Sequence, residues 1–142
     1  MINPSKFVRK AIFEAINETY PTFTSQVTGD LNPTQYVLIS TQDKEIDKVN
    51  KCAYQWVSYT LLDIVCIYNG AGNVGSRLIN DDMETAIMAL IEDIEIDGYT
   101  VLNRRYEFPS NLDSSTTTQT VYRNFIRVIL TLEENNNYLE SL

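Results

Sequence analysis

The sequence predicts an α+β domain with a small, mainly antiparallel sheet and two helices packed on one of its faces. Two stretches have the apolar spacing of amphipathic helices, and four others are rich in β-branched and aromatic residues. Their order along the chain is α-β-β-α-β-β, which is typical of an α+β fold. The length of 142 residues suits one domain spanning 1–142, with a tail expected to fray from about residue 134.

The first helix is predicted from Asn3 to about Glu18. Asn3 is a good N-cap, and Pro4 suits the first helical position because its missing N–H would have no partner there. The apolar residues recur at helical spacing: Phe7, Val8, Ala11, Ile12, Ala15 and Ile16. They form one stripe, which we expect to pack on the sheet.

Two strands are predicted next. The first is Tyr36–Ser40, preceded by loop-like or short extended chain over Pro21–Thr34. The polar stretch Thr41–Lys51 is expected to be an exposed loop. The second strand, Tyr54–Tyr68, becomes apolar on both faces toward its end, so that half should be central in the sheet. Asp63 interrupts its apolar face and is expected to be paired or near an edge.

A second helix is predicted from Asn80, as N-cap, to Asp97, with Gly98 as its C-cap. Glu92 and Asp93 then fall near its C-terminal end, where acid is unfavourable for the helix dipole. They are therefore candidates for a surface that meets a basic partner.

The last two strands are predicted at Tyr99–Phe108 and Thr120–Leu132, joined by a long loop over Pro109–Thr118. Arg123 and Arg127 alternate with Phe125 along one face of the final strand, and Arg105 could lie on the neighbouring strand. One interpretation is a solvent-facing sheet surface with cross-strand pairs to Glu107. The other is a subunit or partner interface, where arginine and aromatic residues are enriched.

Composition limits the possible chemistry. The chain has no histidine, which removes the commonest general base and metal ligand. Its two cysteines lack C-x-x-C spacing, and we expect both to be reduced. The net charge of −8 disfavours binding of free nucleic acid. No apolar run is long enough to span a membrane, and the N-terminus lacks a signal peptide, so cytoplasmic production is expected.

Residues 70–75, with Gly70, Gly72 and Gly75, match G-x-G-x-x-G between the long strand and the second helix. A dinucleotide site also needs a buried parallel strand before the turn, and an acid at the end of a second strand about 20 residues later. The acids at that distance, Glu95 and Asp97, still belong to the predicted helix. We therefore predict no cofactor and no catalytic residue, and interpret the segment as a pliable turn that could contact a neighbouring subunit.

The layout of the chain resembles the tail terminator, or tail completion, proteins of tailed bacteriophages. The resemblance covers roughly Asn3 to Leu132. It comprises the N-terminal helix, strands like Tyr36–Gln42 and Tyr59–Tyr68, a Gly/Asn-rich turn, the helix from Asn80 to Asp97, and a long hairpin ending in Tyr122–Val128. The lysine-bearing segment Thr41–Tyr54 departs from the family's pattern.

The resemblance implies a structural virion protein and not an enzyme. Such proteins form rings at the head–tail junction, usually hexamers or higher cyclic assemblies, between the tail tube and the head–tail connector. Genomic DNA passes through the ring without sequence-specific binding, and an acidic surface suits such a lumen. The protein would be assembled in the host cytoplasm and reside in the tail or neck. A neck-ring subunit, a small nucleotide-binding enzyme using the glycine turn, and a cytoplasmic protein-binding module remain as alternatives.

Overall fold

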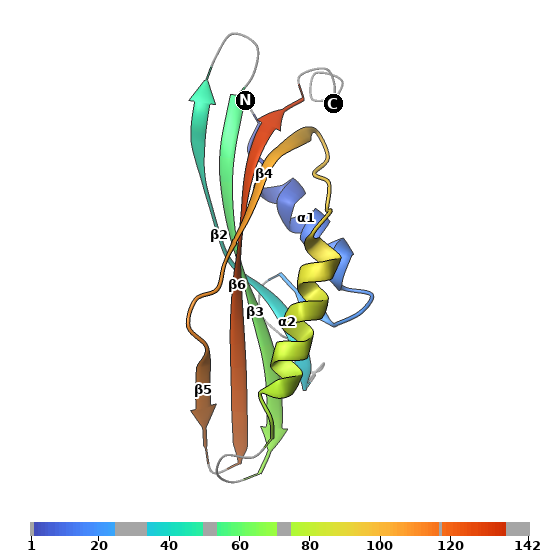
Figure 1. Cartoon of the computed structure of the whole chain (residues 1–142), viewed down its shortest axis with the longest axis vertical. Helices are drawn as coiled ribbons and strands as arrows, with labels where there is room; N and C mark the ends of the chain where they lie inside the picture. The colour runs from blue at the N-terminus through green and yellow to red at the C-terminus, as the bar shows by residue number, and fades with distance from the viewer. Residues whose placement is uncertain (1, 25–33, 50–53, 71–74, 117, 136–142) are drawn as a thin grey trace.

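The computed structural model describes residues 2–24, 34–49, 54–70, 75–116 and 118–135. The elements are α1 (Ser5–Ile16), β1 (Thr22–Phe23), β2 (Gln35–Val49), β3 (Tyr54–Asn69), α2 (Leu78–Ile91), β4 (Tyr99–Glu107), β5 (Leu112–Ser115) and β6 (Gln119–Glu134). Both helices lie on one side of a long, strongly twisted sheet (Figure 1). The predicted α+β class is thus confirmed.

The sheet is built around the antiparallel pair β3 and β6. These strands stay in register from Gln55 opposite Glu133 to Asn69 opposite Gln119. β2 pairs antiparallel with the other side of β3, and β4 and β5 follow one another along the outer side of β6. Among the described strands, only β1 and β2 pair in parallel, over two residue pairs. The long strand predicted from Tyr54 is therefore central, as expected.

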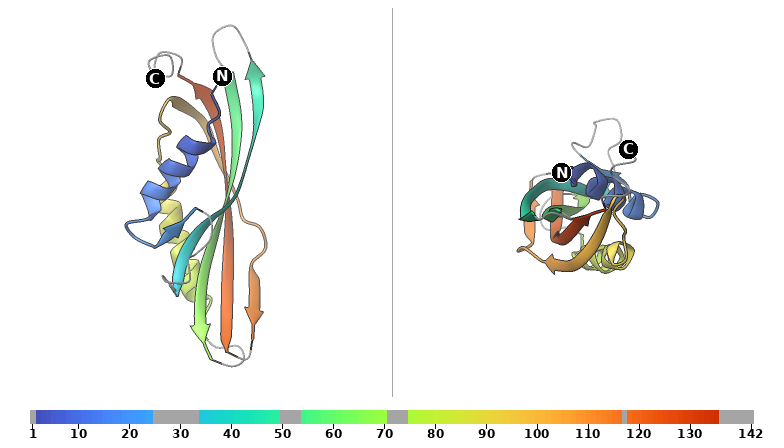
Figure 2. Two further views of the ribbon diagram at one scale, coloured as in Figure 1. Left: turned by 180° about the vertical axis from the view of Figure 1, so that it is seen from behind. Right: turned by 90° about the horizontal axis from the view of Figure 1, so that it is seen from above.

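The core lies between the helices and the sheet. Each helix contributes residues four positions apart, which share one face of a helix. The helix residues buried in the core are Val8, Ile12 and Ile16 of α1, and Met83, Ile87 and Ile91 of α2. They cover alternate residues of the central strands, among them Leu62, Ile64, Cys66, Ile126, Val128 and Leu130. The end-on view of Figure 2 shows both helices on one side of the sheet and none on the other.

The predicted loop at Thr41–Lys51 is wrong, because β2 continues to Val49. Its charged residues are tolerated in a strand because β2 pairs with β3, and Asp43, Lys44 and Glu45 are exposed. Bulges between Ile39 and Gln42 and between Ile46 and Lys48 interrupt the register and blur the alternation that identifies a strand in sequence. The Pro109–Thr118 loop likewise contains β5, four residues paired with β6.

The predicted limits of the second helix are also wrong. α2 begins at Leu78, where the Ser76 hydroxyl oxygen accepts a hydrogen bond from the Leu78 N–H at 3.1 Å. Asn80 is not its cap. That side chain is fully buried and donates hydrogen bonds to the carbonyl oxygens of Ile64 and Tyr122, at 3.3 and 2.9 Å. α2 ends at Ile91, so Gly98, at φ +82°, shapes the turn into β4 and does not cap the helix.

The segment before α1 is fastened to the end of β6. The buried Glu134 carboxylate accepts hydrogen bonds from the Ile2 N–H at 2.5 Å and the Trp56 indole N–H at 3.1 Å. The Tyr99 hydroxyl donates to the Ile2 carbonyl. The helix begins at Ser5 with Pro4 at the cap position, one residue later than predicted, and the Asn3 side chain accepts a hydrogen bond from the Ser5 N–H at 2.9 Å. One carboxylate thus links the N-terminal segment to β3 and β6.

Within the described residues, no helix is long and apolar enough to cross a membrane. Cys66 is buried and free, and burial raises the pKa of its thiol to about 11. It therefore behaves as the small core hydrophobe expected of a reduced cysteine. Cys52 lies outside the described residues.

Replacing Ile87 by alanine should lower the free energy of unfolding by about 2–5 kcal/mol, because the side chain is fully buried between α2 and the sheet. Urea denaturation measures the change. Leu78→Ala on the same helix is the matched control, because Leu78 is 71% exposed and its truncation should cost under about 0.5 kcal/mol. Equal losses for the two variants would contradict the core described above.

Candidate subunit interface

The predicted arginines lie together on the sheet face that carries no helix, which we call the open face. Arg123, Phe125 and Arg127 alternate along β6 with residues buried under the helices. On β4, Arg105 stands opposite Ile129 and Glu107 opposite Arg127. Arg123, Phe125 and Arg127 therefore share one face as predicted, and Arg105 of the neighbouring strand lies on the same face.

Arg123 is engaged with Asp63 at the centre of this face. Its guanidinium lies 2.6 Å from the carboxylate across the β3–β6 pair, so the prediction that Asp63 is paired is confirmed. The Asp63 side chain is 5% exposed, and its second oxygen has no hydrogen-bond partner among the described atoms. Burial raises the pKa of the Asp63 carboxyl, and Arg123 opposes that rise. Arg123 therefore serves mainly to neutralise a buried acid.

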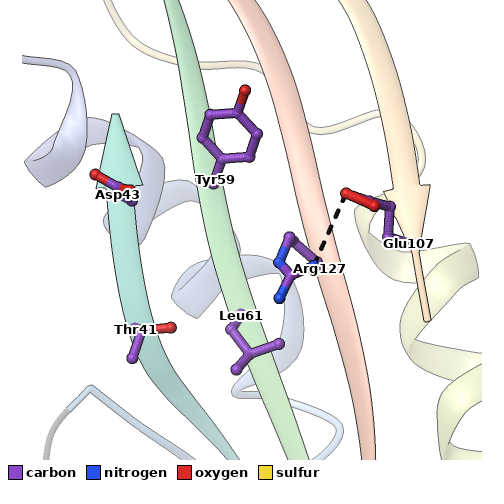
Figure 3. A pocket seen from close by; sticks show the side chains of 6 residues that line it. All are labelled: Thr41, Asp43, Tyr59, Leu61, Glu107 and Arg127. Atoms are coloured by element: carbon purple, nitrogen blue, oxygen red, sulfur yellow. Dashed lines mark ion pairs between the residues drawn. The ribbon is translucent and has the colours of Figure 1, made fainter. Parts of the chain in front are cut away.

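A pocket of about 350 Å³ lies on the open face and crosses four neighbouring strands (Figure 3). Its lining comprises Thr41 and Asp43 of β2, Tyr59 and Leu61 of β3, Arg127 of β6 and Glu107 of β4. Arg127 and Glu107 form an ion pair at 3.9 Å. The lining combines carboxylate, guanidinium, phenol and leucine, which suits a polar protein partner.

Sequence reasoning missed the β2 side of this pocket because it assigned those residues to a loop. Asp43 and Glu45 stand opposite Tyr59 and Val57 of β3, so both lie on the open face. The Tyr59 hydroxyl donates a hydrogen bond to Glu45 at 3.0 Å, and this bond is the main cause that raises the pKa of Tyr59. The alternation of Asp43 and Glu45 with Lys44 was the available signal for a strand.

The predicted acidic residues lie on the other side of the sheet. Glu92 and Asp93 are exposed, directly after α2. Their charges act on Tyr106, which packs against the core from β4; burial is the main cause that raises the pKa of Tyr106, with a smaller contribution from these acids. Adjacent residues of a strand point to opposite faces of the sheet, so Arg105 and Tyr106 lie on opposite sides of β4. Glu92 and Asp93, which lie near Tyr106, are therefore on the side away from Arg105. The structure does not bring these predicted interface residues into one site.

The glycine turn has a structural explanation. Gly70 and Gly75 adopt φ of +134° and +89°, conformations that favour glycine. A Cβ on Gly75 would lie 2.2 Å from the Tyr68 ring, whose hydroxyl donates to the Ser76 carbonyl at 2.9 Å. Gly72 lies outside the described residues. The strand before the turn, β3, is antiparallel to both neighbours, unlike the parallel strand of a dinucleotide site.

A polar cluster that the sequence analysis missed holds the start of α2 against β6. The Arg77 guanidinium donates to the side-chain amide oxygen of Asn124 at 2.6 Å, lies 5.1 Å from the centre of the Tyr122 ring and pairs with Asp113 of β5. The fully buried Asn124 amide donates to both Asp81 and Glu84 at 3.1 Å. These contacts tie the Arg77 guanidinium to both β5 and β6.

Arg123→Ala should destabilise the protein by about 2 kcal/mol at pH 7, because it leaves the Asp63 carboxylate buried without its cation. The half-buried Arg123 keeps this below the cost of a fully buried pair. Because the pKa of the Asp63 carboxyl is raised in the folded state, the protein loses stability as pH rises through that pKa. Removal of Arg123 raises the pKa of Asp63 further, since the arginine opposes the rise. The loss should therefore shrink toward pH 4, as urea denaturation at both pH values would measure.

Arg127→Ala is the control for this measurement. Both Arg127 and its partner Glu107 are at least 40% exposed, so the expected loss at pH 7 is under about 1 kcal/mol. A loss in Arg123→Ala that is equal at the two pH values would contradict the role assigned to Asp63.

Gly75→Ala should cost about 1–3 kcal/mol, since it combines a positive φ with a clash against the Tyr68 ring. In a Tyr68→Ala background the ring is absent, and the same substitution should cost less. Thermal unfolding of the four proteins in this double-mutant cycle measures the coupling. Strictly additive effects would show that the ring does not restrict the turn.

No family model matches the sequence, and no curated protein matches it. Among solved structures, the fold is similar to that of a chain in the "Virion of native gene transfer agent (GTA) particle". The TM-score is 0.67 at 8% sequence identity, and the match covers 92% of this chain and 99% of the other. At that identity, the comparison establishes a shared fold.

Proposed function

We propose that this protein is a structural component of a phage-like virion, and that it forms a ring at the head–tail junction. In this role, as a tail terminator or a neck-ring subunit, it joins the connector to the tail and lets DNA pass. The observation that carries the proposal is the shared fold with a chain of a gene transfer agent virion, over nearly the whole length of both chains.

The chemistry of the surface supports the same role. The net charge of −8 suits the wall of a channel through which DNA slides, because like charge keeps the duplex from adhering. The open face carries polar and apolar side chains that can meet protein neighbours, and neither of the described helices covers it. The expected partners are further copies of this chain in a hexamer or larger ring, the tail tube and the connector.

The enzyme alternative is weaker. The G-x-G-x-x-G turn follows a strand that is antiparallel on both sides, and the tight approach of Gly75 to Tyr68 already accounts for one of its glycines. A rise of several degrees in thermal stability with ATP or NAD would revive this alternative.

Deletion of the gene, in a strain that produces the particle, tests the proposal. A terminator should give tails of irregular length that carry no heads, whereas a neck-ring subunit should give tails of normal length that remain unjoined. Electron microscopy of the particles distinguishes the two, and mass spectrometry of purified wild-type particles should detect the protein in a constant number of copies. Normal joined particles after deletion, and absence of the protein from wild-type particles, would refute the proposal.

A further inference from the structure

The described part of the sheet ends in two unpaired strand edges. β1 pairs with β2 only at Val37 and Leu38, so no described strand lies beside the outer side of β2 beyond that point. On the opposite edge, β4 pairs with β6, and no described strand lies beyond β4. Unpaired edges expose backbone N–H and C=O groups that can pair with another chain.

The β2 edge carries opposite charges on its two sides. Asp43 and Glu45 are exposed on the open face. Lys44 lies on the helix side, opposite the buried Ser58. Arg9 of α1 reaches the same side and donates a hydrogen bond to Gln42 at 3.2 Å. This edge is therefore acidic on the open side and basic on the helix side.

The β4 edge carries the inverse pattern. Arg105 is exposed on the open side, where the neighbouring Glu107 is already paired with Arg127. On the helix side, Glu92 and Asp93 lie near Tyr106. Arg104 is half-buried on that side, with one guanidinium nitrogen buried and without a hydrogen-bond partner among the described residues, so these three charges sum to −1. The edge is basic on the open side and acidic on the helix side.

Strand direction allows the two edges to join. The pairs β2–β3, β3–β6 and β6–β4 are all antiparallel, so β4 runs antiparallel to β2. A second copy in the same orientation beside β4 therefore presents its β2 antiparallel to β4, and the sheet continues. A two-fold axis perpendicular to the sheet would instead set like edges together, with acid against acid or arginine against arginine on the open side.

We propose that the β4 edge of one copy binds the β2 edge of the next copy, head to tail. This inference deepens the proposed function, because it assigns the contact between subunits of the ring. Head-to-tail contacts close into a ring when the rotation between copies allows it. Exposed apolar side chains are present on both edges, with Ile46 of β2 43% exposed and Leu102 of β4 49% exposed. Their burial would add to the charge complementarity and to the backbone hydrogen bonds.

The first test is zero-length carbodiimide cross-linking of purified full-length protein, mixed from isotopically light and heavy preparations, at rising concentration. We expect Lys44 to cross-link to Glu92 or Asp93 in peptides that join light with heavy chains. The Lys10–Asp97 pair is the internal control, because it lies at 3.8 Å within one chain and should link only within one isotope. Absence of mixed-isotope links at Lys44 would overturn the inference.

The second test reverses the charges. Arg105→Glu alone, and Asp43→Lys with Glu45→Lys, should each weaken self-association about tenfold or more, as measured by light scattering and native mass spectrometry. The triple variant should recover most of the wild-type association, because both edges are then inverted on the open side. Asp82→Lys, at an exposed position of α2, is the matched control and should associate like the wild type. Circular dichroism verifies that each variant is folded.

The two proposals fail separately. Charge reversals that leave self-association unchanged would refute the edge contact and leave the virion function standing. A particle that assembles normally without the gene would refute the function, while mixed-isotope links would still support the contact between edges.

Discussion

The antiparallel pairing of β3 and β6 is the interaction on which the rest of the fold depends. Both strands run the full length of the sheet, and fifteen consecutive residue pairs join them without a bulge. Every other sheet strand except β1 is bonded directly to one of the two, and both helices pack on their buried side. The ladder also places Arg123 opposite Val65, within reach of Asp63, and so brings that buried acid its counter-charge.

Much of this framework could be predicted from the sequence, because the central elements have strong periodic patterns. The alternation along β6 predicted correctly that Arg123, Phe125 and Arg127 share one face, and the helical spacing of the apolar residues in α1 predicted its buried stripe. Edge elements were harder. β2 reads as a loop beyond Ser40, because an exposed edge needs no apolar pattern and its bulges break the alternation. Asn80 reads as a cap because burial of its amide depends on carbonyl groups from distant strands.

The same contrast applies to the candidate interface. The position of Arg123 and Arg127 on one face followed from alternation alone, whereas the position of Arg105 on the same face follows from the register of β4 against β6. The pairing of Arg123 with Asp63, and the position of Glu92 and Asp93 on the opposite side, required knowledge of strand order and register. Residues that look equivalent in sequence therefore have different roles. Arg123 stabilises the fold, whereas Arg105 of β4 and the acidic pair Glu92 and Asp93 remain exposed.

The hydrogen bond from the Ile2 N–H to Glu134 brings the N-terminal segment and the end of β6 to the same end of the subunit. It holds the segment before α1 against the end of β6, at the end of the molecule away from the start of α2 (Figure 1). Gly70 and Gly75 lie at the other end, where β3 finishes. In a ring of identically oriented copies, one rim would carry Ile2 and Glu134 of every copy, and the other would carry Gly70 and Gly75. The two rims would therefore differ chemically, which gives such a ring a direction along its axis.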